Sequence, residues 1–222
     1  MQKYVIIVAG GKGLRMGGAI PKQFLEVKGK PILMRTIERF LAYDSAISVR
    51  LVLPQSHFDY WHELCEKYQF TAPHTLVEGG ETRFYSVLHG LNSIHPTEQA
   101  MVAVHDGVRP FVSVETIDAT FKTAAELGAA VPVVPSVDSL RKVNESGSES
   151  VDRSLFRLVQ TPQTFQYDIL KKAYEQTYRD TFTDDASVVE AAGYTIQLVD
   201  GNRENVKITT AYDMKIADAL VD

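Results

Sequence analysis

Apolar runs and amphipathic stretches alternate along the chain, and this alternation predicts strands and helices in turn. A short, continuous apolar run is typical of a strand that is buried on both faces. Apolar residues three and four positions apart predict a helix, as after Pro31, where Ile32, Leu33, Ile37 and Phe40 share one face. The predicted strands are residues 5–8, 49–53, 75–77, 101–104, 130–134 and 195–199. The predicted helices start at residue 31 and otherwise span residues 57–68, 82–94, 114–127, 167–178, 185–192 and 211–220.

Strands that alternate with helices predict an α/β fold, with a Rossmann-like, mostly parallel sheet and helices on both faces. No internal repeat or interdomain linker is visible, so residues 1–222 are expected to form a single domain. In such sheets a ligand binds at the carboxyl ends of the strands. Functional side chains are therefore expected where the predicted strands end.

Residues 136–153 depart from this alternation, because the segment is polar and rich in serine. Its flanks, residues 139–143 and 150–153, are compatible with a two-stranded hairpin around a turn at residues 144–147. An isolated hairpin is marginally stable in water. We therefore expect this segment to be an arm that packs on a second subunit, with a mobile surface loop as the alternative.

Composition narrows the class of ligand. The chain has 222 residues, 45% of them hydrophobic, and a formal net charge of −5 without any basic run. This balance argues against nucleic acid and membrane surfaces as partners. The sequence begins without a signal-peptide pattern and has no apolar stretch long enough to span a bilayer. Its single cysteine, Cys65, fits a reducing compartment, and we expect a cytoplasmic protein with small-molecule ligands.

The most informative motif follows the first predicted strand, where residues 9–17 read AGGKGLRMG and residues 21–23 read PKQ. A glycine-rich loop brings backbone N–H groups close to a phosphate, because no Cβ blocks the approach. Arg15 and Lys22 add two cations, which suits a polyphosphate whose charge grows during a reaction. The spacing excludes both the P-loop pattern and the dinucleotide-binding fingerprint. The alternative is a flexible loop with solvated side chains.

Three further motifs carry polar residues beyond predicted strands: GGETR at 79–83, HDGVRP at 105–110 and GNRENVKIT at 201–209. Thr82 is positioned to cap a helix. Asp106 would be repelled by a triphosphate unless a divalent cation lay between them, so it is a candidate Mg²⁺ ligand, or otherwise a turn cap. Lys207 is the clearest functional candidate in the last motif, although a lysine at such a position can simply be solvated.

Together these motifs resemble those of the 2-C-methyl-D-erythritol 4-phosphate cytidylyltransferases of the non-mevalonate isoprenoid pathway. The resemblance extends from the first strand to Thr209. It implies a nucleotidyltransferase domain that joins CTP and methylerythritol 4-phosphate to give CDP-methylerythritol and pyrophosphate. It also implies Mg²⁺ or another divalent cation as cofactor, and a homodimer in which residues 136–153 are the dimerisation arm.

The resemblance implies a role for individual residues as well. The catalytic residues would be Arg15, Lys22, Arg153 and Lys207, with Arg153 reaching the site of the other subunit. The nucleotide would be bound by Ala9, Gly10, Gly11, Gly13, Gly80, Glu81, Ser86 and Asp106. The polyol phosphate would be bound by Arg109, Ser139, Thr161 and Thr183. The metal would be bound by Asp106 and Glu204. The chain departs from the family pattern where Glu81 and Glu204 replace aspartate and Ser139 replaces threonine.

No nucleophile elbow, catalytic triad or zinc-ligand spacing is visible in the sequence. A phosphate monoester is already anionic at neutral pH, so its attack on CTP requires positioning and charge stabilisation rather than a strong base. Two alternatives remain at the level of sequence. One is transfer to ribitol 5-phosphate or another sugar phosphate on the same fold, and the other is a non-catalytic nucleotide-binding module.

Overall fold

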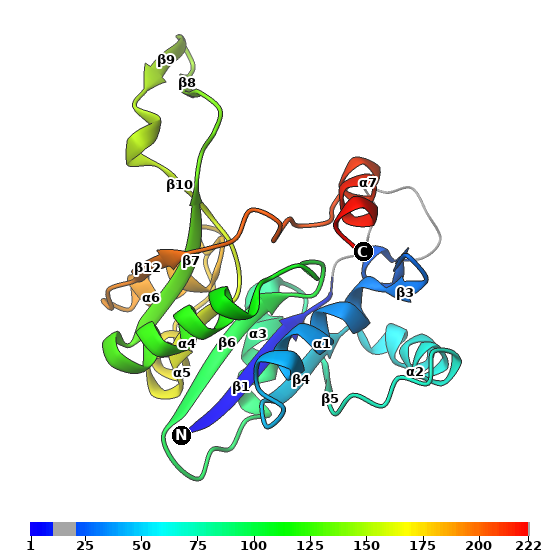
Figure 1. The fold of residues 1–222 in the computed structure, drawn as a ribbon. Coiled ribbons are helices and arrows are strands. Elements are labelled where there is room, and N and C mark those ends of the chain that lie inside the picture. Colours follow the sequence, from blue (N-terminus) through cyan, green and yellow to red (C-terminus); the bar gives the residue numbers. More distant parts are fainter. Residues whose placement is uncertain (11–20, 222) are drawn as a thin grey trace.

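A computed structural model describes residues 1–10 and 21–221 and is built around one central sheet (Figure 1). The strand order is β10-β7-β11-β6-β1-β4-β5, with β12 paired to β7. All neighbouring pairs are parallel except those that involve β10 and β11. The strands are Gln2–Val8 (β1), Ser48–Leu53 (β4), Thr75–Glu78 (β5), Ala100–Asp106 (β6), Ala129–Pro135 (β7), Arg157–Val159 (β10), Gln163–Gln166 (β11) and Gln197–Asp200 (β12). The predicted α/β fold with a mostly parallel sheet is therefore confirmed.

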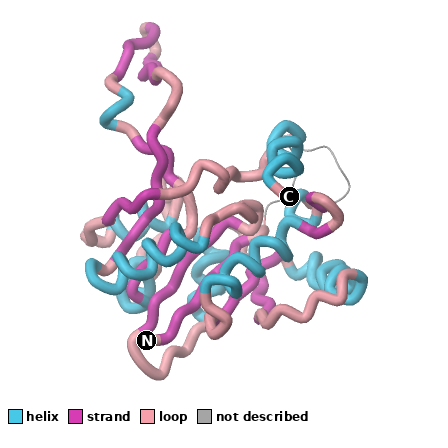
Figure 2. Tube along the Cα trace, in the orientation of Figure 1, coloured by secondary structure: helices cyan, strands magenta, loops and turns pink. Residues whose placement is uncertain are grey.

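Helices cover both faces of this sheet, as Figure 2 shows. They are Ile32–Tyr43 (α1), Phe58–Lys67 (α2), Arg83–Asn92 (α3), Val114–Leu127 (α4), Tyr167–Ala173 (α5), Asp185–Ala191 (α6) and Ala211–Leu220 (α7). Successive residues of β1 face opposite sides of the sheet. Val5 and Ile7 pack with α1, α2 and α4, whereas Tyr4 and Ile6 pack with α3, α5 and α6. The continuous apolar run of β1 thus serves two separate cores.

Two differences from the sequence-based expectation concern polar segments. Strand β11 has no apolar run, yet it lies between β6 and β7, where the Gln163 side chain donates to Asp184 and the Thr164 hydroxyl donates to Thr120. The predicted helix at 167–178 ends early, at Ala173, where the Gln176 side chain donates to the terminal carbonyl at 2.9 Å. In both places partners distant from the local pattern satisfy the polar groups.

A small hairpin, Glu26–Val27 (β2) and Lys30–Pro31 (β3), precedes α1. Its turn residues, Lys28 and Gly29, have positive φ values of 42° and 75°, which suit a tight hairpin turn. Between this hairpin and the sheet, a short 3-10 helix at Lys22–Phe24 follows Pro21. The chain therefore turns sharply just where the first motif ends.

The predicted hairpin at 136–153 exists, as Leu140–Asn144 (β8) paired with Gly147–Val151 (β9), and it projects from the body of the molecule (Figure 1). Large apolar side chains on and beside it are exposed: Val137 by 61%, Val143 by 78% and Leu155 by 80%. The predicted arm covers residues 136–153, and we extend the name to residues 136–156 so that it includes the short 3-10 helix at Arg153–Leu155. Within the described residues, no helix is long and apolar enough to cross a membrane.

Candidate active site

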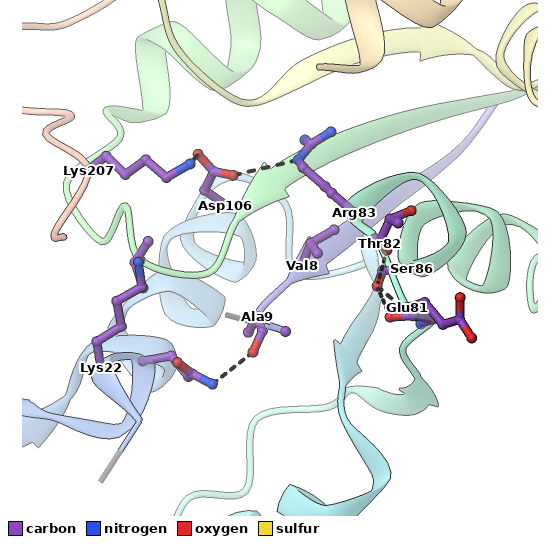
Figure 3. Close-up of a pocket in the computed structure, with 13 residues that line it drawn as sticks. Val8, Ala9, Lys22, Glu81, Thr82, Arg83, Ser86, Asp106 and Lys207 are labelled. Atoms are coloured by element: carbon purple, nitrogen blue, oxygen red, sulfur yellow. Dashed lines mark hydrogen bonds and ion pairs between the residues drawn. The ribbon is translucent and has the colours of Figure 1, made fainter. Parts of the chain in front are cut away.

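The carboxyl ends of β1 and β6 open into a cavity of about 300 Å³, shown in Figure 3. Three further segments complete its wall: the turn that carries Lys22 and Gln23, the turn that leads into α3, and the residues that follow β12. The side chains and backbone of four sequence motifs therefore meet in one place. The lining residues are Val8, Ala9, Gly10, Lys22, Gln23, Gly80, Glu81, Thr82, Arg83, Ser86, Asp106, Val108 and Lys207.

The end of β1 is held in place by hydrogen bonds from three directions. Ala9 donates its backbone N–H to Val52 of β4, and Gly107 donates to the carbonyl of Val8, both at 2.9 Å. The side chain of Gln23, only 1% exposed, donates to the carbonyl of Ala9 at 2.8 Å. Lys22, directly before Gln23, lines the cavity. The hydrogen bond from Gln23 thus fixes the turn that carries Lys22 to the carboxyl end of β1.

The turn at residues 79–82 is shaped by a hydroxyl and by a glycine. Ser86 accepts from the N–H of Gly80 at 3.1 Å and donates to the carbonyl of Thr82 at 2.9 Å. A Cβ added to Gly80 would lie 2.4 Å from the Cβ of Tyr85, so only glycine fits there. Thr82 caps α3, as predicted, by accepting from the N–H of Tyr85. The helix therefore starts at the wall of the cavity.

Asp106 is the centre of the charge arrangement. Its Oδ2 accepts from Lys207 Nζ and from Arg109 Nε, both at 3.0 Å, and its Oδ1 lies 4.0 Å from Arg83 Nε. In Figure 3 the side chains of Lys207 and Arg83 approach it from opposite sides. Burial works to raise the pKa of Asp106, but Lys207, Arg83 and Arg109 hold that pKa well below its ordinary value. Asp106 is therefore a carboxylate at neutral pH.

A ring of buried hydrogen bonds supports Asp106 from behind. His105 Nε2 lies 3.0 Å from the carbonyl of Arg109, so this nitrogen must donate, and Nδ1 then accepts from the hydroxyl of Thr161 at 3.0 Å. That hydroxyl accepts from the N–H of Asp106, and Asn205 Nδ2 donates to the carbonyl of Thr161 at 2.8 Å. Arg109 Nη1 closes the ring on the carbonyl of Asn205. Burial lowers the pKa of His105 to about 4, so the imidazole is neutral.

The structure brings many of the predicted site residues together in the cavity, namely Ala9, Gly10, Lys22, Gly80, Glu81, Ser86, Asp106 and Lys207. Gly11, Gly13 and Arg15 lie outside the described residues. Arg109 and Thr161 belong to the buried ring that supports Asp106, and their binding of the polyol phosphate stays a prediction.

Four other predicted residues do not line this cavity. Ser139 and Arg153 belong to the arm, and Arg153 donates to the carbonyl of Val137 within it. Thr183 is exposed just before α6. Glu204, predicted to bind metal beside Asp106, lines a separate hollow and accepts from the Asn202 side chain at 3.2 Å.

Sequence reasoning missed the cavity roles of Arg83 and Gln23. Both stand within motifs that had drawn attention for other residues. Arg83 occupies the first position of α3, where a helix start faces the cavity, and Gln23 follows the predicted cationic residue Lys22. Their positions within the motifs could have indicated a functional role. Their partners, Ala9 for Gln23 and Asp106 and Asp185 for Arg83, lie elsewhere in the chain and could not be read from the motifs.

A divalent cation would have few protein ligands here. The described residues contain no group of three or more His, Cys, Asp or Glu side chains that could hold a metal ion. Asp106 is charged and faces the cavity, and its Oδ1 lies 4.0 Å from Arg83 Nε, a longer contact than the two that its Oδ2 makes with described residues. Mg²⁺ commonly uses one carboxylate together with phosphate oxygens and waters. Asp106 thus fits a cation that arrives with a triphosphate.

A mostly parallel α/β sheet that gathers a glycine-bearing turn, cations and a carboxylate at its carboxyl edge is the arrangement of an α/β nucleotidyltransferase. Comparison with known proteins narrows this class. The chain belongs to the 2-C-methyl-D-erythritol 4-phosphate cytidylyltransferase family, IspD, whose family model matches residues 3–222. It is therefore a CTP-dependent cytidylyltransferase of isoprenoid precursor synthesis, which removes the non-catalytic alternative.

Individual members of the family are similar to this chain over nearly its full length, in sequence and in structure. The chain is 55% identical over 221 residues to the 2-C-methyl-D-erythritol 4-phosphate cytidylyltransferase of Phocaeicola vulgatus, with 100% of both chains covered. The solved structure of 4-diphosphocytidyl-2C-methyl-D-erythritol synthase from Anaerococcus prevotii has a TM-score of 0.83 at 27% identity, covering 98% of this chain and 95% of that one. The cytidylyltransferase from Thermus thermophilus has a TM-score of 0.77 at 32% identity, covering 99% and 98%.

Proposed function

We propose that the cavity at the ends of β1 and β6 is where the family reaction takes place. A phosphate oxygen of methylerythritol 4-phosphate attacks the α-phosphorus of CTP and forms a new P–O bond. The bond from the α-phosphorus to its bridging oxygen breaks, and pyrophosphate leaves with that electron pair. The observation that carries this proposal is the convergence of Lys22, Arg83, Lys207 and Asp106 in one cavity, where Arg83 and Lys207 both approach the Asp106 carboxylate.

Lys22 is assigned to the charge on the α-phosphate and the departing pyrophosphate. It lines the cavity next to the end of β1, and Gln23 anchors the turn that carries it. Arg15, from the same motif, is assigned to the same charge. Cations that are already in place before the charge develops stabilise the transition state without reorganisation.

The attacking phosphate needs no base from the protein. His105, the histidine nearest in sequence to Asp106, is completely buried, has a pKa lowered to about 4, and uses both ring nitrogens in the supporting ring. A phosphate monoester is anionic near neutral pH, so the protein's task is alignment of the reactants. Lys207, which reaches Asp106 from the side of β12, is assigned to hold the attacking phosphate.

Asp106 is proposed as the residue that would hold a divalent cation when CTP is bound. The cation would neutralise phosphate oxygens where negative charge increases. Lys207 and Arg109 compensate the charge of Asp106 in this structure. Glu204 lines a separate hollow, so it is not assigned to this cation.

The arm is proposed to complete the site of a second subunit. Its apolar side chains are exposed by as much as 80%, a state that association with another chain would relieve. Arg153 does not line the cavity of its own chain, which is compatible with a contribution across a homodimer. Arg153 of the partner subunit would then join Lys207 at the attacking phosphate. We expect the dimer to act in the cytoplasm, where CTP is supplied.

The reaction is tested by pyrophosphate release from CTP and Mg²⁺, with methylerythritol 4-phosphate and ribitol 5-phosphate offered separately. We expect release and a CDP-methylerythritol product, identified by mass, with methylerythritol 4-phosphate only. Release with ribitol 5-phosphate alone would retain the mechanism but refute the acceptor. The absence of pyrophosphate release with both acceptors would refute the proposed reaction.

A further inference from the structure

Arg83, which faces Asp106 in the cavity, also binds a second carboxylate, that of Asp185. Asp185, the first residue of α6, is 0% exposed. Its Oδ2 accepts from Arg83 Nη2 at 2.6 Å, and its Oδ1 accepts from the hydroxyl of Tyr174 at 2.6 Å. Both oxygens of this buried carboxylate are therefore engaged, one by a residue that lines the cavity.

Arg83 remains a cation in this setting. Burial opposes its charge, but Asp185 and then Asp106 raise the pKa of the guanidinium above its ordinary value. The planar fork of a guanidinium can bind one carboxylate along one edge and present other N–H donors elsewhere. With Asp185 on one side, Arg83 lies between the turn at 79–82 and Asp106.

The partners of Asp185 are themselves held firmly. Tyr174 is 2% exposed, and its ring stacks on Phe84, the neighbour of Arg83 on α3, at 4.6 Å between centroids. The start of α6 is tied to β11, because Gln163 donates to Asp184 and accepts from the N–H of Ala186, both at 2.8 Å. The carboxylate of Asp185 therefore has a fixed position relative to α3 and the sheet.

We propose that Asp185, with the Tyr174 hydroxyl, is a positioning residue that aims Arg83 at bound CTP. The proposal rests on the proposed function of the cavity. Asp185 does not touch the nucleotide, because it is completely buried and does not line the cavity. It acts through Arg83, because its hydrogen bond to Nη2 restricts the orientations that the guanidinium can adopt. A misplaced charge contact of this kind can cost up to about a hundredfold in a bound complex.

The test compares Asp185→Asn with Glu190→Gln, which removes a carboxylate charge from the same helix. Glu190 is exposed near the end of α6, so this control loses its charge away from Arg83 and from the hydrogen bonds that fix Asp185. We expect Asp185→Asn to raise the dissociation constant of CTP, measured by calorimetry, about tenfold or more. The KM for methylerythritol 4-phosphate should rise less than the dissociation constant of CTP, because Lys207 reaches Asp106 from the side opposite Arg83. The control should match the wild type.

A double mutant separates positioning from a general structural role. If Asp185 acts through Arg83, adding Asp185→Asn to Arg83→Gln should cause no further loss of CTP affinity. An additive loss, equal losses for both substrates, or wild-type CTP affinity in Asp185→Asn would overturn the proposal. If Asp185→Asn does not fold, Tyr174→Phe, which removes one hydroxyl, should raise the CTP dissociation constant about two- to fivefold, and no change would refute the inference. Calorimetry with CTP alone does not require turnover, so failure here is distinct from failure of the proposed reaction.

Discussion

At the scale of single residues, the site depends on how charges are compensated. Asp106 has cations on two sides, and His105 is neutral because its ring is buried between a carbonyl and a hydroxyl. The same motif, histidine followed by aspartate, thus yields one charged group that faces the cavity and one uncharged group that supports it. The difference comes from burial and partners, not from the residue types.

Removal of Lys22 tests the charge assignment. We expect Lys22→Ala to lower kcat about 10²- to 10³-fold, because a preorganised cation at the developing charge is lost. Lys122→Ala is the matched control, since that lysine is 73% exposed and pairs only with Asp118 on α4 among its described ion pairs. Steady-state kinetics measure the effect, and thermal unfolding should show that both variants fold. A folded Lys22→Ala enzyme with nearly normal turnover would contradict the role.

The neutral state of His105 predicts a pH dependence of stability. Its folded-state pKa, about 4, is below the ordinary value of 6.5, so the unfolded chain binds more protons between these two values. The contribution is fully present above about pH 6.5 and is lost as the pH falls toward 4, by up to about 3 kcal/mol. Urea unfolding of the wild type and of His105→Gln should give curves whose difference narrows over this window. A difference that stays constant between pH 7 and 4 would refute the neutral, buried imidazole.

At the scale of elements, strand ends and helix starts place the chemistry. The end of β1, the end of β6 and the start of α3 each bring one motif to the cavity. Their ranges follow from periodicity, and the helix at 114–127 has the predicted bounds. Strands β10 and β11 were not predicted, because three or four residues are too few to show a strand period, and such short segments become strands only when neighbouring strands complete their hydrogen bonds.

The turn before α3 can be tested at Gly80. In Gly80→Ala the new methyl group would lie 2.4 Å from the Cβ of Tyr85, so the turn must shift. We expect the KM for CTP to rise about tenfold and stability to fall by about 1–3 kcal/mol. The KM for methylerythritol 4-phosphate serves as the internal control and should change little. Unaltered CTP kinetics would show that the turn does not contact the nucleotide.

At the scale of the whole molecule, the chain combines the cavity with an arm that projects from the body (Figure 1) and carries exposed apolar residues. The proposed dimer would join the arm of each subunit to the cavity of the other. Isologous pairing of this kind creates two equivalent sites, each built from both chains.

Mixing two inactive variants tests this arrangement. Arg153→Ala and Lys22→Ala enzymes, unfolded together and refolded, would form heterodimers in which one site contains both intact residues. Random pairing predicts about a quarter of the wild-type activity. Each variant refolded alone is the control and should remain inactive. If the mixture is also inactive although Arg153→Ala alone has lost activity, Arg153 acts within its own chain, and the proposed exchange between subunits is wrong.

The sequence by itself determined the alternation of strands and helices, the glycine-rich and cationic character of the first motif, and the acidic and basic residues beyond the strands. These are local properties, set by periodicity, glycine and side-chain charge. Only the tertiary structure decided that Arg83 meets Asp185, 102 positions away, and that Thr161 and Asn205 support Asp106. It also placed Glu204 in a separate hollow. Such pairings depend on how distant elements pack against one another, and no local pattern in the chain encodes the partner of a buried polar group.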